Sequence, residues 1–447
     1  MLTHSKKEAK VGTTPLQAFL MSMGGRVGAG NIVGVTGAIS IGGPGAIFWM
    51  WVSAVLGMST AFAEGTLAQI YKERKGDEYV GGFTFYTQKL WRNKVWVGTA
   101  MCVLYLIYNL MSIPVHTFHV FTSMSTIMDT ALNRTTDVTE PVYYVVAVVI
   151  IVVIAIIAFG GIKKAVGFAD AAVPTMALIY IAVAVLLMVA NITKLPAFFV
   201  AIFTQAFKPQ SIFGGTFGIA LAQGLKRGLL SNEAGMGSAT QAAAVSDQDH
   251  PCEQGIMQSI GVFIDTVVIC TLTGFIVAGG AIWENPNIDW SSIKYNKMAT
   301  FVASIRELTP GTALDSIVVI VVILAFGLFA FTTLCCDITY SEIAAHKVSD
   351  KKGVIKAVRV AGAFVFVPLG TLTVLSGLQL DNLWAVSDLV NIVLVFVNVP
   401  TLFIGHKIII AAYKDYKAHK GERFVSARIG VKSDVWTEEE AKARAQE

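Results

Sequence analysis

The sequence predicts an all-α polytopic membrane protein whose core holds ten helices in two inverted repeats of five, with the first and sixth helices broken. Three observations predict this class: the composition, the number of long apolar stretches, and two glycine-rich interruptions at corresponding places. Of the 447 residues, 54% are hydrophobic and 14% are charged, whereas soluble proteins carry roughly 25% charged residues. The charges lie in patches between apolar runs, so we expect a lipid bilayer around this chain and no nucleic-acid partner.

Ten apolar stretches are long enough to cross the ~30 Å hydrocarbon core of a bilayer. They cover approximately residues 15–41, 45–71, 96–127, 141–160, 168–190, 212–246, 255–281, 312–342, 356–377 and 383–412. The aromatic segment 195–207 is too short to span, so we expect an interfacial helix there. The expected organisation is a cytoplasmic tail (1–14), one transmembrane domain (15–412, repeat one about 15–190 and repeat two about 212–412) and a second cytoplasmic tail (413–447).

Lysine and arginine are distributed unevenly between alternate connections. Basic clusters at 72–94 and 347–359 lie on the same predicted side as the basic N-terminus and the basic tail from Lys414. The opposite connections carry few such residues. Because basic loops stay in the cytoplasm, we expect a multi-pass protein of the inner or plasma membrane with both termini cytoplasmic.

The first apolar stretch is interrupted by four glycines in the eight residues from Gly24 to Asn31. Each glycine costs a helix ~1 kcal/mol relative to alanine, so this segment is predicted to be unwound. Unwound backbone at membrane depth is tolerated where protein or a water-filled cavity receives its polar groups. The break therefore indicates a ligand site, and the alternative is a kink in which glycines let neighbouring helices approach closely.

A similar break, Glu233 to Ser238, interrupts the sixth stretch and contains Gly235. Paired interruptions in corresponding halves indicate a transporter site between inverted repeats. Arg26 and Glu233 occupy matching positions in the two breaks. Because charges at this depth pair or line water, we expect both to stabilise the unwound segments, either with each other or with other partners.

Polar residues inside four other stretches are further candidates. Asp265, near the middle of the seventh stretch, is predicted to meet a substrate ammonium or a cation. Trp384, Asp388 and Asn391 lie on one helical stripe of the tenth. Trp384 either covers the substrate or is an interfacial aromatic residue. In the eighth, Thr332 and Thr333 offer hydroxyls to a hard cation, or bond back to their own helix.

Several motifs resemble the alanine or glycine:cation symporter family (sodium:alanine symporters). The segment 42–52, GGPGAIFWMWV, is similar to the signature of that family. The sixth stretch, with KRG at 226–228 and SNEAGMGS at 231–238, and the sequences DHP at 249–251 and FIDT at 263–266 extend the resemblance. It runs from about Thr14 to Lys407 and implies a leucine-transporter-type fold of five plus five inverted helices.

The resemblance also implies roles for the first break. Its pattern, with Gly24, Val27, Gly28, Gly30 and Asn31, resembles the broken first helix of the leucine transporter, an architecture known for binding substrate and ions at such helices. The half-helix that begins near Gly30 presents free N–H groups to a substrate carboxylate. Carbonyl groups at Gly24 and Val27 would join the two threonine hydroxyls around sodium.

Three departures from the family concern the same region. Ala29 stands where the family usually has threonine, His116 ends a segment of the third stretch that differs from the family, and Asp337 follows Cys335 and Cys336 after the threonine pair. We expect His116 near the substrate, whereas an intramembrane histidine more often makes a hydrogen-bonded helix contact. The resemblance therefore predicts the scaffold and leaves the substrate open.

The predicted function is that of a sodium-coupled secondary symporter, not an enzyme, which imports a small neutral amino acid such as alanine or glycine by alternating access. No cofactor is expected beyond the co-transported sodium ion, and the sequence has no G-x-x-x-x-G-K-[ST] nucleotide motif. One alternative is a proton-coupled or exchange-type amino-acid permease, because histidine titrates near physiological pH. Another is a membrane sensor derived from a transporter.

Overall fold

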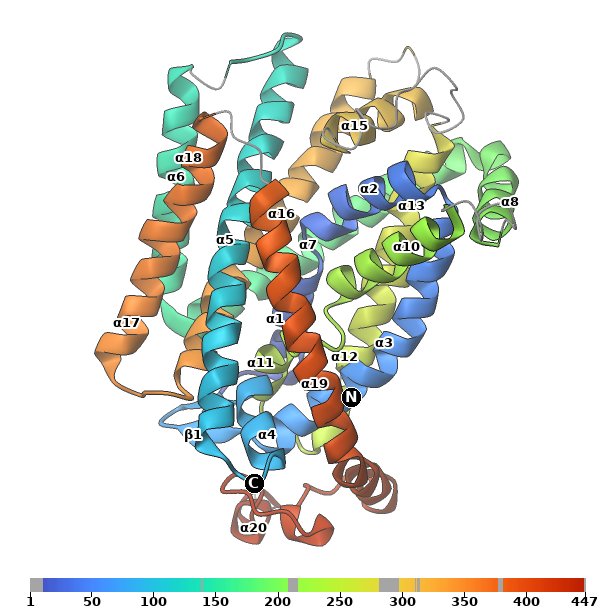
Figure 1. Cartoon of the computed structure of the whole chain (residues 1–447). Coiled ribbons are helices and arrows are strands. Elements are labelled where there is room, and N and C mark those ends of the chain that lie inside the picture. Colours follow the sequence, from blue (N-terminus) through green and yellow to red (C-terminus); the bar gives the residue numbers. More distant parts are fainter. Residues whose placement is uncertain are drawn as a thin grey trace.

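The computed structural model describes residues 11–137, 140–207, 216–280, 297–309, 311, 314–376 and 381–445, with the backbone alone for 216–217, 381–387 and 444–445. The described chain is a bundle of helices (Figure 1). Eight helices within it are long and apolar enough to cross a membrane. They coincide with the second to fifth and seventh to tenth predicted stretches.

These eight membrane-length helices include two that contain a π-helical segment. The uninterrupted helices are α3 (Gly45–Ile70), α5 (Val95–Leu132), α6 (Pro141–Phe159), α7 (Gly161–Ala190), α16 (Leu314–Ala345) and α19 (Asp381–Ala418). The other two are α12 (Pro251–Val262), η4 (Phe263–Ile269) and α13 (Cys270–Gly279) in one, and α17 (Lys352–Ala361), η6 (Gly362–Phe366) and α18 (Val367–Leu375) in the other. Such π-helical segments occur frequently at functional sites, and η4 contains Asp265.

The first and sixth stretches are interrupted, as predicted. The first consists of α1 (Pro15–Arg26), the 3₁₀ turn η2 (Ala29–Asn31) and α2 (Val33–Gly42). The sixth consists of α10 (Thr216–Asn232) and α11 (Ala239–Ala244), separated by six residues. In that gap Glu233, Gly235 and Gly237 have positive φ angles of 54°, 86° and 82°, which a right-handed helix cannot contain.

The connections and the C-terminal segment contain short elements. The sequence analysis anticipated one of them, the helix expected at 195–207. These elements are β1 (Glu73–Lys75) paired antiparallel with β2 (Glu78–Val80), α4 (Phe83–Leu90), η3 (Ile192–Lys194), α8 (Leu195–Ala206), α15 (Lys297–Leu308), η7 (Ser426–Ile429) and α20 (Glu438–Ala445). Helix α8 is the one expected, and it projects from the bundle in Figure 1.

Two groups of helices pack around the interrupted pair. In one group α3 packs on α10 and α12, and in the other α16 packs on α5 and α7. Helix α1 contacts both groups, through α7 and α16 on one side and α11 and α12 on the other. Small residues allow close contact between α3 and α12, because a Cβ added to Gly65 would lie 3.1 Å from the Cα of Gly255. The interrupted helices therefore lie where the two groups meet.

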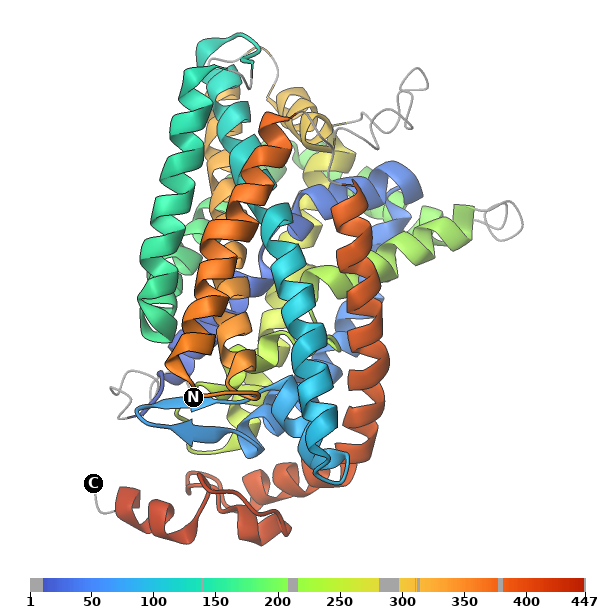
Figure 2. The ribbon, with the colours of Figure 1, turned by 60° about the vertical axis from the view of Figure 1, so that its left-hand side comes forward.

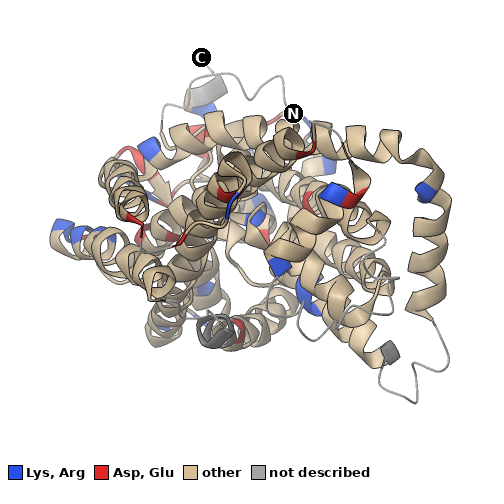
Figure 3. Ribbon diagram, turned by 90° about the horizontal axis from the view of Figure 1, so that it is seen from above, with Lys and Arg blue, Asp and Glu red and all other residues tan. Residues whose placement is uncertain are grey.

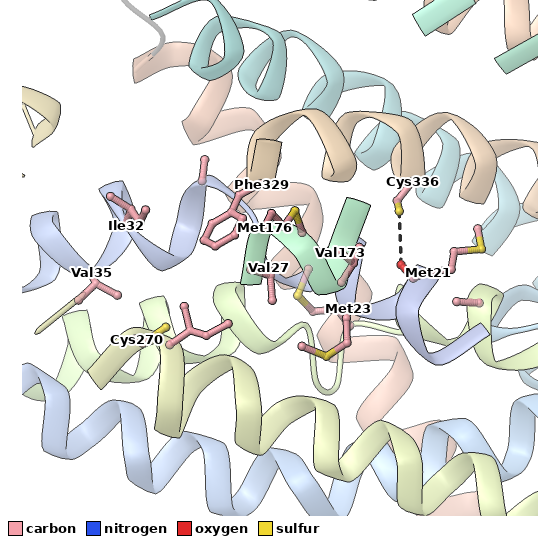
Figure 4. Close-up of a cluster of buried hydrophobic side chains, with 14 of the residues drawn as sticks. Met21, Met23, Val27, Ile32, Val35, Val173, Met176, Cys270, Phe329 and Cys336 are labelled. Carbon is pink, nitrogen blue, oxygen red and sulfur yellow. Dashed lines mark hydrogen bonds between the residues drawn. The ribbon is translucent and has the colours of Figure 1, made fainter. Parts of the chain in front are cut away.

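Apolar side chains pack around the first break (Figure 4). Val27 and Ile32 flank the 3₁₀ turn and are fully buried in the same cluster as Met176 of α7 and Phe329 of α16. The thiol of Cys336 donates a hydrogen bond to the carbonyl of Met21 at 3.4 Å. This packing fixes the unwound segment although the segment has no continuous helical hydrogen bonding.

The two ends of the described chain lie at the same end of the bundle. Val11, Tyr79 and Trp436 belong to one buried cluster, and the indole N–H of Trp436 donates to the carbonyl of Gln69 at 2.7 Å. Figure 2 shows the C-terminal segment folded beneath the helices. Ends on one side require an even number of crossings. The segment expected as a tail from 413 begins inside α19, which continues to Ala418.

We expect Trp436→Ala to destabilise the protein because it empties a fully buried site beneath the bundle. Large-to-small changes of this kind cost about 3–5 kcal/mol. The measurement is the melting temperature of the purified protein in detergent. The matched control is Trp96→Ala, at a site that is 68% exposed, and equal melting temperatures for both variants would contradict the packing role.

Candidate functional site

A cavity of about 50 Å³ lies between the two breaks. This volume has room for a few water molecules or a comparably small solute. Its walls come from both interruptions and from α5, α10, α16 and α19. Of the residues expected to bind substrate, Gly28, Gly30 and His116 line the cavity. The two predicted interruptions are therefore brought together around one cavity.

Thr333 approaches the backbone of Gly28 closely. A Cβ added at position 28 would lie 2.6 Å from Thr333 Oγ1, which would have to move, and 3.7 Å from His116 Cε1, in ordinary van der Waals contact. The N–H of Gly28 donates to Asn31 Oδ1 at 2.9 Å. Ala29, the residue that departs from the family, is fully buried in the turn. The first break thus presents backbone rather than side chain to the cavity.

Asp265 connects the two interrupted helices. Its carboxylate accepts hydrogen bonds from Asn31 Nδ2 at 2.6 Å, from Ser231 Oγ at 2.8 Å and from the hydroxyl of Thr266 at 2.8 Å. Asn31 follows the first break and Ser231 ends α10, so one carboxylate joins both. Neither Asp265 nor Asn31 is part of the described cavity wall; both lie behind the break.

The two adjacent threonines of α16 face different surroundings. The hydroxyl of Thr333 lies 3.0 Å from the carbonyl oxygen of Gly24 and 3.3 Å from that of Gly25. The hydroxyl of Thr332 donates to the carbonyl of Phe329 at 2.9 Å and lies 3.6 Å from the sulfur of Met176. Carbonyl and hydroxyl oxygens therefore converge at Thr333.

Val27, the other residue expected near an ion, continues the last turn of α1. Its N–H donates to the carbonyl of Met23 at 2.7 Å. The carbonyls that approach Thr333 come from Gly24 and Gly25, so the oxygen cluster lies one turn before Val27.

Glu64 of α3 holds the second break, a role that the sequence analysis missed. Its carboxylate accepts the N–H groups of Gly235 at 3.2 Å and Gly237 at 2.9 Å, and also a hydrogen bond from Asn398. Gly235, predicted to contact substrate, is turned toward Glu64 and Asn398 by these bonds. The available signal was that Glu64 is the single charged residue of α3, and an intramembrane charge indicates function.

Arg26 and Glu233 both line the cavity, and no ion pair joins them in the described part of the chain. Arg26 Nη1 instead donates to the carbonyl of Gln258 at 3.1 Å. An ion pair of 2.7 Å connects Lys226 of α10 to Asp388 of α19, which also lines the cavity. Other ion pairs join Arg359 to Glu342 and Arg306 to Asp315, and in the view from above in Figure 3 most of the ribbon is neither basic nor acidic.

Helix α19 contributes Asp388 to the cavity wall, while Asn391 is buried next to it along the helix. The side chain of Trp384 lies outside the described residues. On α5, His116 lines the cavity 3.9 Å from Asp337 of α16. The sequence analysis noted both of these positions as departures from the family, and the structure brings them together.

Comparisons with known proteins agree with this architecture. The model of the "Sodium:alanine symporter family" matches residues 1–427. The chain is 34% identical over 413 residues to the "Probable sodium/glutamine symporter GlnT" of Bacillus subtilis, covering 92% of this chain and 80% of that protein. It is also 34% identical over 445 residues to the "Amino-acid carrier protein AlsT" of the same organism, covering 98% and 89%.

Among solved structures, the chain is similar to MhsT in complex with L-phenylalanine, with a TM-score of 0.55 and 14% identity. The match covers 89% of this chain and 99% of that one, and at this identity it shows the fold alone. The expected leucine-transporter-like fold is thereby confirmed. This multi-pass membrane protein is a cation-coupled amino-acid transporter rather than an enzyme, and it belongs to the sodium:alanine symporter family.

Proposed function

We propose that this protein couples inward sodium flow to the uptake of a small neutral amino acid of the alanine and glycine class. The observation that carries the proposal is the cavity between two broken helices, with the oxygen cluster of Thr333, Gly24 and Gly25 beside it. A relative that is 34% identical is named as a probable sodium/glutamine symporter, and this supports the choice of ion.

The substrate carboxylate would occupy the first break. Gly28 and Gly30 leave the cavity wall free of side chains there, and α2, whose dipole is positive at its N-terminus, begins just after them at Val33. A volume of about 50 Å³ favours a short side chain. Asp265 would act through Asn31, whose amide holds both the carboxylate of Asp265 and the N–H of Gly28.

Sodium would bind at Thr333, where carbonyl and hydroxyl oxygens suit a hard cation. Because two of those carbonyls belong to the last turn of α1, a bound ion would order the first broken helix. The helices around α3 would then rock against those around α16, so that the cavity opens to one side at a time. The termini would face the cytoplasm, in accordance with the distribution of basic residues.

The test of this function is uptake of a radiolabelled amino-acid panel by the protein in liposomes, with sodium and proton gradients imposed separately. Accumulation driven by sodium is the expected result. Uptake that ignores sodium and follows the proton gradient would favour the permease alternative. His116 and Asp337 give that alternative a specific basis, because they are two titratable groups on the cavity wall.

Asp265→Asn is expected to abolish sodium-driven uptake. The asparagine amide would direct one N–H₂ group at side chains that now donate to the carboxylate, so the link between the two broken helices would be lost. Charge-assisted hydrogen bonds of this kind contribute about 1.5–3 kcal/mol each. Uptake is measured at equal amounts of folded protein, and uptake within twofold of the unaltered protein would exclude this role.

A further inference from the structure

We infer that His116 and Asp337 form the side-chain subsite of the cavity, and that they select a neutral amino acid whose side chain both donates and accepts a hydrogen bond. This inference rests on the proposed function, because it assigns the substrate class of the same site. A hydroxyl group or a carboxamide has this chemistry, so among small neutral amino acids the pair prefers one that carries such a group to alanine or glycine.

The two residues approach each other from opposite helices without bonding directly. His116 Nε2 of α5 lies 3.9 Å from Asp337 Oδ2 of α16, beyond the length of a hydrogen bond. Both side chains are largely buried and both line the cavity. A polar group of a ligand that lies beside the pair in the cavity could contact both atoms.

Each residue has a polar atom without a hydrogen-bond partner. Asp337 is 5% exposed, and its Oδ2 has none; neither does Nδ1 of His116. A buried polar atom left unpaired costs about 1–3 kcal/mol, so such atoms are rare in folded proteins. Because Asp337 Oδ2 lies opposite His116 Nε2 on the cavity wall, a ligand group that donates to this oxygen would complete its bonding.

The chemistry of the pair defines the complementary group. A carboxylate only accepts hydrogen bonds, and a neutral imidazole has one N–H donor. With the imidazole N–H on Nε2, the ring nitrogen that faces Asp337, a ligand group in contact with both side chains donates to Asp337 and accepts from His116. A methyl group can do neither and would leave Asp337 Oδ2 unpaired.

The cavity wall carries charges of both signs. Arg26 and Arg227 line it together with Glu233, Asp337 and Asp388, so a charged side chain would meet a like charge as well as an opposite one. A neutral polar side chain avoids the cost of burying a further charge there.

The pair also lies at the correct distance from the site proposed for the substrate main chain. A Cβ added to Gly28 would lie 3.7 Å from His116 Cε1, so the imidazole is in van der Waals reach of the first break. A ligand whose carboxylate is held at Gly28 and Gly30 would reach His116 and Asp337 with a short side chain.

The experiment compares near-isosteric amino acids that differ in hydrogen-bonding capacity. Unlabelled serine and 2-aminobutyrate are compared as competitors of radiolabelled serine uptake in sodium-driven liposomes. Unlabelled asparagine and leucine are compared in the same way as competitors of radiolabelled asparagine uptake. At least a tenfold preference for the polar member of either pair is expected. A preference in the first pair identifies a hydroxyl ligand, and a preference in the second identifies an amide.

Asp337→Leu and His116→Leu should each reduce that preference below threefold while the apolar members still compete. His119→Leu is the matched control on α5, because His119 packs against Phe326 and is not part of the described cavity wall; its preference should equal that of the unaltered protein. If Asp337→Leu does not fold, His116→Leu and the unaltered protein still provide the test.

The outcomes separate the subsite from the proposed function. If amino acids are transported with sodium but the two members of each pair compete equally, the result overturns the assignment of the subsite and leaves the proposed function intact. The same holds if Asp337→Asn changes only the pH dependence of uptake, since the pair would then carry a proton. If no amino acid of the panel is taken up with sodium, the proposed function itself fails.

Discussion

Thr333→Val is expected to raise the sodium concentration for half-maximal uptake at least tenfold, or to abolish sodium-driven uptake. The substitution keeps the shape of the side chain and removes the oxygen that faces the carbonyls of Gly24 and Gly25. A tenfold change corresponds to about 1.4 kcal/mol, a modest loss for one ligand of a partly dehydrated cation. Initial rates of labelled amino-acid uptake against sodium concentration provide the measurement.

Thr332→Val is a matched control one residue away. Both threonines donate a hydrogen bond to the carbonyl of Phe329 within their own helix, so both valines lose that bond. Only Thr333 also faces the break of the first helix. Equal sodium dependence in the two variants would mean that the ion does not bind at Thr333.

Glu64→Ala is expected to destabilise the protein and to eliminate transport. The substitution leaves the buried N–H groups of Gly235 and Gly237 without their acceptor, at a cost of about 1–3 kcal/mol for each group. It also removes the partner of Asn398. We expect a lower melting temperature in detergent and no uptake in liposomes.

Glu64→Gln retains one acceptor oxygen and should fall between Glu64→Ala and the unaltered protein. Glu307→Ala, at an exposed position of α15, controls for the loss of a carboxylate and should change neither measurement. A stable Glu64→Ala variant that transports normally would show that the second break is held by other groups.

Much of the scaffold was predictable because it depends on local properties of the chain. Lipid offers no hydrogen-bond partners, so each apolar stretch must satisfy its own backbone as a helix, and the eight membrane-length helices lie where hydropathy predicts them. The interruptions at Gly28 and Gly235 follow from glycine content in the same way. The hairpin β1–β2 and helices α4 and α15 were not anticipated, because they are short elements outside the long apolar stretches on which the prediction depends.

The partners of the site residues were less accessible to sequence reasoning. Asp265 was recognised as an intramembrane carboxylate, and its position behind the first break became apparent only with Asn31 and Ser231 in place. Glu64 was passed over although its charge inside α3 is equally unusual. Its partners lie 171 and 173 residues away, a distance that no local pattern covers.

The sequence by itself therefore determined a helical membrane protein with two broken helices, because hydropathy and glycine content act within a single segment. Only the tertiary structure decided that Thr333 rather than Thr332 faces the break, and that His116 lies beside Asp337. Neighbouring residues on a helix point about 100° apart, so the rotation of each helix selects which side chain reaches the cavity. That rotation is set by packing among all the helices together.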